Sequence, residues 1–351
     1  MAILDDPLKQ IREYYGKVLQ RSSDLKTSVC CAVEGMPPHL DGLIDDIEPE
    51  ILERFYGCGA PIPYALEGCT VLDLGCGTGR DVYMASRLVG EDGRVIGIDM
   101  TEEQLKVAER CLEAQMRRYG YARPNVAFRL GYMEDLADAG IEDASVDVVI
   151  SDCVINLSPQ KERVFAEIFR VLKPGGELYF SDVFADRRLP AYLMTDPVLH
   201  GECLAGAMYE EDFRRMMHAL GYADVRSVCR SPIRIESSEI ERRIGMARFS
   251  SITVRAFKLD TLEDRCEDYG QVATYLGTID GYPHRVRLDD HHEFETGRAL
   301  RVCGNTAAML TDTRLSGHFR VQGDRSTHFG LFDCSPTQGP QSDGLDDAGC
   351  C

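Results

Sequence analysis

A run of alternate glycines follows one acidic residue in an otherwise apolar segment. Residues 71–79 read Val-Leu-Asp-Leu-Gly-Cys-Gly-Thr-Gly. This pattern predicts a buried strand that carries Asp73 and ends in a tight turn, where a ligand comes close to bare backbone. A dinucleotide-binding turn needs another small residue at position 80 to pack its helix on the strand, but that residue is Arg80. The turn therefore indicates a nucleotide-like ligand without a pyrophosphate.

Cysteines are the second set of residues that could do chemistry. There are 14 in 351 residues, about 4%, which is below the share of a disulfide-rich scaffold, so we expect a reducing, cytoplasmic compartment. No Cys-x-x-Cys or Cys-x-x-His pair occurs, and a zinc site has little support. Four cysteines within predicted elements are expected to serve mainly in packing: Cys69, Cys76, Cys111 and Cys229.

The elements that must position these residues alternate along the chain. A helix is predicted after the glycine turn, over 81–88. Further strands are predicted at four places: 94–99, 125–130, 146–150 and 177–181. This alternation predicts an α/β fold with a doubly wound, mostly parallel sheet that binds its ligand at the carboxyl ends of the strands. Residues 183–222 are expected to be largely helical, and 225–235 with 250–257 to add an antiparallel pair that completes seven strands.

Composition excludes several classes of partner. The formal net charge is −19, which argues against a long contact with nucleic acid phosphates or an anionic membrane surface. No apolar stretch approaches the roughly 18 residues of a membrane span, and the first residues lack the basic and apolar segments of a secretory signal. We expect a soluble monomer. The histidines of the polar C-terminal part, His284, His291 and His292, have no ligand spacing and are expected at the surface.

The glycine pattern resembles motif I of the class I methyltransferases, which bind S-adenosylmethionine on a Rossmann-like sheet. That cofactor has no phosphate, and its methionine end carries an ammonium group that an acid such as Asp73 can steer. Asp99 ends the predicted strand 94–99, about 20 residues after the turn, where a ribose is gripped in such folds. The resemblance thus implies an S-adenosylmethionine site at this edge of the sheet.

Four cysteine-containing stretches resemble those of one methyltransferase family, the arsenite methyltransferases. These stretches are 27–30, 55–59, 151–157 and 201–207, and residues 178–183 also match. The resemblance extends from the helix predicted over 8–23 to about residue 257. It is looser over 262–330 and returns in the terminal pair Cys350-Cys351.

Roles for the cysteines follow from this resemblance. Cys153 and Cys203 are implied to hold arsenic, with Cys58 as a third sulfur in part of the cycle. Cys30 and Cys58 are implied to form a disulfide that returns the oxidised product to the trivalent state. Cys31 directly follows Cys30 and is not a general feature of the family, so which of the two acts stays open. A thiol reductant, glutathione or thioredoxin, would recharge the relay.

The cofactor site that the resemblance implies includes Tyr56 beside the sulfonium, where an aromatic face favours a cation. The other expected cofactor residues come from the glycine turn and the ends of the following strands: Asp73, Gly75, Cys76, Gly77, Asp99, Met100, Met133 and Glu134. The chain is then expected to divide into an N-terminal helix with cysteine loops, the cofactor domain, an arsenic-binding segment with the last strands, a small C-terminal module and a disordered tail: 1–60, 61–182, 183–258, 259–332 and 333–351.

The chemistry of the cysteines suits arsenic independently of the family resemblance. Cys153 follows the strand 146–150, so it lies at the carboxyl edge of the sheet, where the methyl donor must point. Thiolates select soft ions, and trivalent arsenic bound by sulfur keeps a lone pair that can attack a methyl carbon in line. No general base is required, because arsenic carries no proton to remove.

Three alternatives remain from the sequence. RNA cytosine-C5 methyltransferases also keep a cysteine after the fourth strand, but a proline precedes it there, whereas Asp152 precedes Cys153 here. A methyltransferase of a quinone or sterol shares the cofactor motifs but needs no thiol cluster. A thiol-rich sensor or scavenger of soft metals would need no Asp73 or Asp99.

Overall fold

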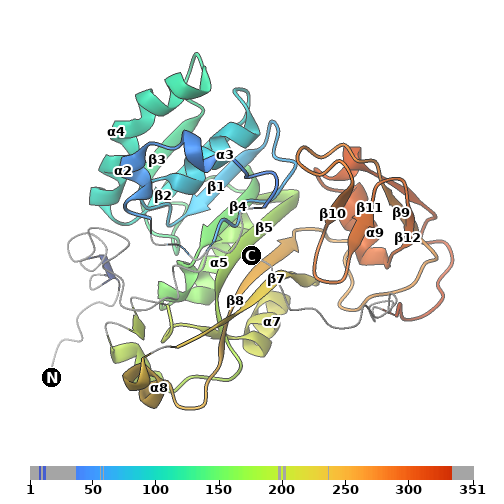
Figure 1. Cartoon of the computed structure of the whole chain (residues 1–351). Helices are drawn as coiled ribbons and strands as arrows, with labels where there is room; N and C mark the ends of the chain where they lie inside the picture. The colour runs from blue at the N-terminus through green and yellow to red at the C-terminus, as the bar shows by residue number, and fades with distance from the viewer. Residues whose placement is uncertain are drawn as a thin grey trace.

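One large sheet forms the centre of the molecule (Figure 1). The computed structural model describes residues 8, 11, 12, 37–55, 57, 59–196, 199, 200, 203–235 and 237–333. Within them, the strand order is β3-β2-β1-β4-β5-β8-β7, and a two-residue β6 pairs with β5 beside this path. The strands of the sheet are β1 Thr70–Leu74, β2 Arg94–Asp99, β3 Val126–Leu130, β4 Val146–Asp152, β5 Leu172–Ala185, β6 Met208–Tyr209, β7 Val225–Ile233 and β8 Phe249–Phe257.

The first five strands are parallel, as the alternation of strands and helices predicts. Their apolar residues are buried, as expected for a sheet covered on both faces. β8 runs antiparallel to both β5 and β7, so the predicted antiparallel pair is confirmed. The doubly wound, mostly parallel sheet is confirmed, with β6 as an addition to the seven expected strands.

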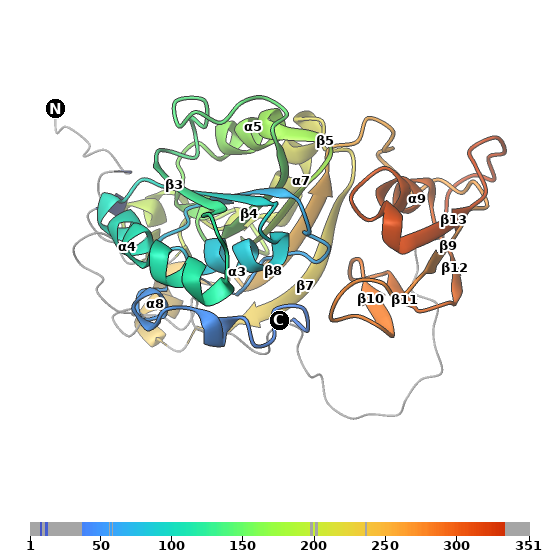
Figure 2. The same ribbon diagram turned by 90° about the horizontal axis from the view of Figure 1, so that it is seen from above.

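Helices cover both faces of the sheet (Figure 2). α3 (Arg80–Val89), α4 (Glu102–Tyr119) and the short α2 (Pro49–Leu52) pack on one face, where Val71 and Val148 lie in their shared core. α5 (Lys161–Val171) and α7 (Glu210–Ala219) pack on the other. The other short helices before the C-terminal module are η3 Ile44–Asp46, η4 Ile155–Leu157, η5 Ala191–Thr195 and α8 Ser238–Ile244. Within the described residues, no helix combines the length and the apolar character needed to span a bilayer.

The expectation that 183–222 is largely helical is wrong. β5 continues to Ala185 because β8 pairs with it up to the register Ala185↔Phe249. Among the described residues that follow β5, helical structure is confined to η5, to Leu199 with His200, and to α7. Residues 203–207 form an irregular turn. Backbone pairing with a distant strand, which local periodicity does not reveal, overrides the helical pattern there.

The C-terminal module stands beside the end of the sheet (Figure 1). It contains a three-stranded sheet, a two-stranded sheet and two short helices: β9 Val272–Tyr275, β10 Arg285–Arg287, β11 Glu293–Glu295, β12 Ala299–Arg301, α9 Gly304–Thr311, η6 Ser316–His318 and β13 Phe319–Gln322. The expectation for His292 is wrong, because this side chain is buried and its Nδ1 lies 2.7 Å from Asp289 Oδ1.

A buried ion cluster joins this module to the sheet. Glu177 of β5 is fully buried, and its two carboxylate oxygens meet Arg255 of β8 at 2.7 Å and Arg314 of the module at 2.5 Å. Arg255 also donates to Leu288 O at 2.5 Å and to the Tyr64 hydroxyl at 3.2 Å. One carboxylate therefore balances two guanidinium groups at the junction.

Replacing that carboxylate is expected to destabilise the protein strongly. Glu177→Gln keeps the shape but leaves two buried guanidinium groups without a counter-charge, and it should lower the free energy of unfolding by about 3–5 kcal/mol. Denaturant unfolding measures this. The exposed Glu293, which lies 3.5 and 3.6 Å from Arg285 and Arg287, supplies the control: Glu293→Gln should change stability by less than about 0.5 kcal/mol. Equal effects of the two changes would contradict the role of the cluster.

Candidate functional site

The glycine turn after β1 serves packing at two positions and leaves space at a third. Gly75 and Gly79 have φ of +72° and +89°, and a Cβ would lie 2.4 Å from Val154 at the first and 3.0 Å from Phe128 at the second. Gly77 also has positive φ, but a Cβ there would meet nothing within 4 Å. The turn thus faces open space at Gly77, as a cradle for a ligand requires.

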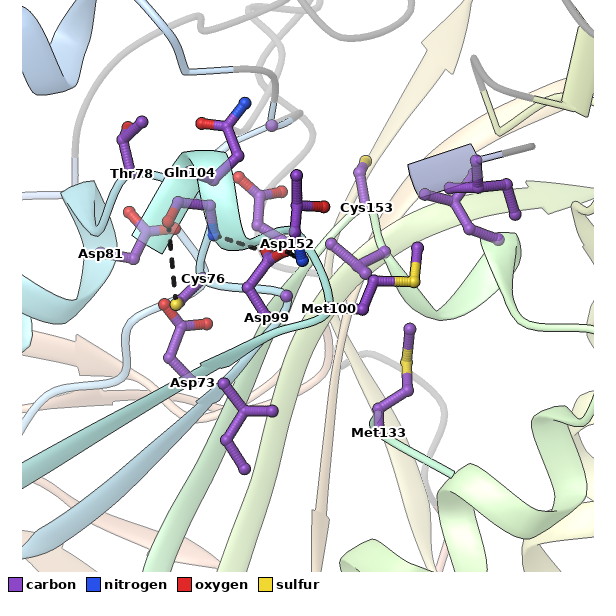
Figure 3. Close-up of a pocket in the computed structure, with 18 of the residues that line it drawn as sticks. Asp73, Cys76, Thr78, Asp81, Asp99, Met100, Gln104, Met133, Asp152 and Cys153 are labelled. Carbon is purple, nitrogen blue, oxygen red and sulfur yellow. Dashed lines mark hydrogen bonds between the residues drawn. The ribbon is translucent and has the colours of Figure 1, made fainter. Parts of the chain in front are cut away.

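Asp99 fixes this turn from the end of β2. Its Oδ2 accepts a hydrogen bond from the Gly77 amide at 2.9 Å, and its Oδ1 accepts one from the Thr101 amide at 2.8 Å (Figure 3). Burial raises the pKa of Asp99, and these two hydrogen bonds oppose the rise. Each carboxylate oxygen retains a lone pair that can accept a further hydrogen bond.

A pocket opens at the carboxyl ends of β1, β2 and β4. Eight of the nine expected cofactor residues line it: Asp73, Gly75, Cys76, Gly77, Asp99, Met100, Met133 and Glu134. The ninth, Tyr56, lies outside the described residues. The lining also includes side chains that were not predicted: Phe55, Thr78, Arg80, Asp81, Thr101, Gln104 and Asp152. Several of these residues directly follow a motif residue in the sequence. They could have been identified as the residues that begin the helix after each strand.

The pocket is rich in carboxylates. Burial is the main cause that raises the pKa of Asp73, and the nearby Asp81 and Asp152 raise it further. Arg80 lies 2.6 Å from Asp81 and 3.6 Å from Asp152, and its guanidinium carbon stands 3.3 Å from the centre of the Phe55 ring. Because one buried arginine faces several buried acids, the pocket favours a cationic ligand.

Cys153 and Cys203 lie side by side at the edge of this pocket. The Cys203 thiol donates a hydrogen bond to the Cys153 carbonyl at 2.9 Å, and both residues are buried. Both have positive φ, +54° and +63°, and the other described non-glycine residues with positive φ are Ala65 and Ala144. Such conformations are costly for residues with a Cβ and concentrate at functional sites.

One asparagine holds the two cysteine-bearing turns together. Asn156 donates to Asp182 of β5 from its backbone amide at 3.0 Å and from Nδ2 at 2.6 Å. A Cβ on Gly206 would lie 2.1 Å from the Asn156 carbonyl oxygen, so the turn that follows Cys203 presses directly on Asn156. The contact between Asp182 and Asn156 therefore helps to position both turns, together with the hydrogen bond from the Cys153 amide to the Ser181 carbonyl at 2.8 Å.

Part of the predicted cysteine set cannot be placed. Cys30, Cys31 and Cys58 lie outside the described residues. Cys153 takes part in a disulfide. Of the stretch 55–59, Gly57 packs so closely on Asp152 that a Cβ would lie 1.9 Å from Oδ2, and the Gly59 carbonyl accepts a hydrogen bond from Arg80.

Comparisons with known proteins point to one family. Residues 65–221 match a family model described as methyltransferase domain, and residues 268–342 match one described as arsenite methyltransferase C-terminal domain. An arsenite methyltransferase of Aquipseudomonas alcaligenes is 54% identical over 93% of each chain. The arsenite methyltransferase of Homo sapiens is 43% identical over 90% of this chain and 83% of that protein. The crystal structure of an arsenic(III) S-adenosylmethionine methyltransferase from Chlamydomonas reinhardtii is 50% identical, with a TM-score of 0.83 over 85% of this chain and 100% of that one.

The buried Asp182 should make stability depend on pH. Burial raises its pKa from 3.8 to about 7 against the hydrogen bonds that it accepts. Between pH 4 and 7 the native protein then keeps a proton that the unfolded chain has lost, so the free energy of unfolding falls as pH rises through this window. Asp182→Asn cannot ionise, and its stability relative to the unchanged chain should improve by up to about 4 kcal/mol from pH 4 to 7.

Urea unfolding at several pH values tests this. Asp92→Asn, at an exposed position, is the matched control and should follow the unchanged chain at every pH. A constant stability difference between Asp182→Asn and the unchanged chain across the window would show that Asp182 stays ionised.

Proposed function

The chain belongs to the arsenite methyltransferase family and is an S-adenosylmethionine-dependent methyltransferase of trivalent arsenic, and from this premise we propose how its residues divide the work. Cys153 and Cys203 hold arsenic, and the pocket beside Cys153 holds the methyl donor. The observation that carries this assignment is the contact between the Cys203 sulfur and the Cys153 carbonyl at the edge of the pocket.

The pocket residues fit S-adenosylmethionine. Asp73 and Asp99 lie in a lining with more acids than bases, which suits a ligand that carries a sulfonium and an ammonium group. Gly77 leaves room for the ligand against the backbone, and Asp99 has lone pairs left for ribose hydroxyls. S-adenosylmethionine held there would supply an electrophilic methyl group for the arsenic lone pair, and its sulfonium sulfur would leave as a neutral thioether.

The contribution of the protein to this reaction is mainly positioning. Sulfur ligands suit a soft ion such as trivalent arsenic, and the two thiols reach it from adjacent turns. Because Asp182 and Asn156 fix these turns, arsenic bound to Cys153 and Cys203 is held in one place relative to the pocket. Fixed orientation of two reactants can supply a large part of a rate enhancement.

Reduction completes the cycle. Cys58 contributes a third sulfur when arsenic carries no carbon, and Cys30 with Cys58 forms the disulfide that returns the oxidised product to the trivalent state. A thiol co-substrate, glutathione or thioredoxin, then restores the protein thiols. The same reductant must also reduce the disulfide at Cys153, because Cys153 must be a thiol before it can bind arsenic.

Loss of the Asp99 carboxylate is expected to weaken cofactor binding. Hydrogen bonds to a charged group are worth about 1.5–3 kcal/mol each, and Asp99 also fixes Gly77, so Asp99→Ala should weaken S-adenosylmethionine binding at least tenfold. Titration calorimetry measures the affinity. Asp92→Ala, on the exposed loop before β2, should bind like the unchanged chain. Unchanged affinity in Asp99→Ala would remove this residue from the site.

The four cysteines should separate into two functional classes. Ser at Cys153 or Cys203 is expected to abolish methylation of every arsenic substrate, because a hydroxyl is a harder, poorly ionised donor. Ser at Cys30 or Cys58 should stop turnover of arsenite but spare monomethyl arsenite, which two sulfurs can hold. If Cys31 substitutes for Cys30, only the double change will be severe.

Product formation from arsenite and from monomethyl arsenite, run side by side, tests this division. Cys111→Ser, at a buried packing position in α4, is the control and should keep both activities. Equal losses on both substrates for all four variants would leave a structural or simple binding cluster as the better account.

A further inference from the structure

Two cysteines outside the proposed reaction meet where the C-terminal module joins the sheet. Cys303 caps α9 and is fully buried, whereas Cys266 is half-buried in the loop before β9. The segments that carry the two cysteines are adjacent, because the amide of Gly304, next to Cys303, donates to the carbonyl of Glu267, next to Cys266, at 2.9 Å. The Cys266 side chain interacts with the Cys303 thiol and is the largest cause that lowers its pKa, and neither residue is in a disulfide. Cys266 also lines a surface hollow between Arg214 of α7 and Glu263. A small solute can therefore reach the pair from the side of Cys266.

The surroundings of Cys303 favour its thiolate. Besides the hydrogen bond from Cys266, the Cys303 sulfur lies 3.4 Å from the Thr306 amide nitrogen, 3.3 Å from Thr306 Oγ1 and 3.8 Å from Arg226 Nη2. The hydrogen bond from Cys266, followed by the charge of Arg226 and the bonds from Thr306, holds the pKa of Cys303 well below its usual range despite burial. The pair thus combines a buried thiolate with an accessible thiol.

The positive charge beside the thiolate is balanced independently of it. Arg226 lies 2.8 Å from Asp224 and 2.7 Å from Asp289, both of them carboxylates. Asp289 in turn accepts a hydrogen bond from the His292 backbone amide at 2.8 Å. If Cys303 gave up its charge to a bound electrophile, Arg226 would keep two anionic partners, so capping of the thiolate leaves no unpaired buried cation.

The donor set suits one class of soft electrophile. A structural metal ion needs about four ligands, and the one described group of side chains that could hold such an ion, Asp289, Asp290 and His291, contains neither cysteine. Two adjacent sulfurs instead match a centre with two exchangeable positions. A trivalent arsenical with one carbon substituent is such a centre, and it binds thiolates for the same reason as the catalytic cysteines do.

We propose that Cys266 and Cys303 form a second arsenic site, which binds a trivalent arsenical that carries one carbon substituent. Two As–S bonds form and two As–O bonds break, with no change of oxidation state. The two hydroxyl groups of the arsenical leave as water, one with the Cys266 proton and the other with a proton from solvent. The inference rests on the proposed function only for the source of this ligand, since a monomethylated product has the required substitution.

A count of bound arsenical tests the site without using turnover. The full chain with Cys153→Ser and Cys203→Ser is reduced with a phosphine and titrated with phenylarsine oxide, a trivalent arsenical with one carbon substituent, and intact mass gives the number bound. Adding Cys266→Ser or Cys303→Ser should each remove one equivalent. The two changes together should still remove one, because they abolish a single shared site.

Matched variants keep the result decisive. Cys229→Ser, at a half-buried position in β7, should leave the count unchanged. Circular dichroism checks folding, and if the buried Cys303→Ser does not fold, the half-buried Cys266→Ser alone decides. An unchanged count in Cys266→Ser overturns the proposal, as does the loss of two equivalents in the double variant. Because Cys153 and Cys203 are absent from every sample, failure here is distinct from failure of the catalytic assignment.

Discussion

The contact between a buried carboxylate and an asparagine underlies the proposed arsenic site. Asp182 lies within β5 and accepts three hydrogen bonds, two from Asn156 and one from the Val183 amide at 2.8 Å. A carboxylate in this dry position is costly unless such donors compensate for lost hydration. Because Asn156 also contacts the turn at Gly206, the same bonds that satisfy the carboxylate set the distance between the two cysteine-bearing turns.

The junction with the C-terminal module relies on similar physics at two separate places. Glu177 joins Arg255 and Arg314 on one side, and Arg226 joins Asp224 and Asp289 on the other. Both arginines of the sheet come from its antiparallel end, Arg226 from β7 and Arg255 from β8. The antiparallel extension thus provides the surface on which the module is oriented, and one of its ion clusters lies directly beside the Cys266–Cys303 pair.

Much of the fold could be predicted because its signals are local. The apolar runs before Asp99 and before Asp152 become parallel strands, and the glycine turn opens the expected pocket. Contacts distant in sequence could not be predicted in this way. The extension of β5 depends on pairing with β8. The burial of His292 depends on its contact with Asp289. The role of Asn156 depends on Asp182, which is 26 residues away in the sequence.

The candidate site was likewise predicted in part from local sequence signals, whereas its contacts between distant residues were not predicted. The eight expected cofactor residues that the family resemblance implied line one pocket. Arg80 and Asp152 were not chosen, because their importance comes from the acids and the ring that surround them in space. Resemblance to a family suggested Cys153 and Cys203, but not their left-handed backbone. The roles of Tyr56, Cys30 and Cys58 stay predictions, since these residues lie outside the described part of the chain.

The backbone at Cys153 and Cys203 also bears on how this family changes over evolutionary time. Glycine and asparagine are the residues that adopt a positive φ most readily, so at both positions the conformation favours replacement of the cysteine. Selection for the thiol opposes that tendency only while arsenic is present. If Cys153 and Cys203 hold arsenic as proposed, mutation in a lineage without this exposure should replace them with glycine or asparagine early and leave a stable methyltransferase fold.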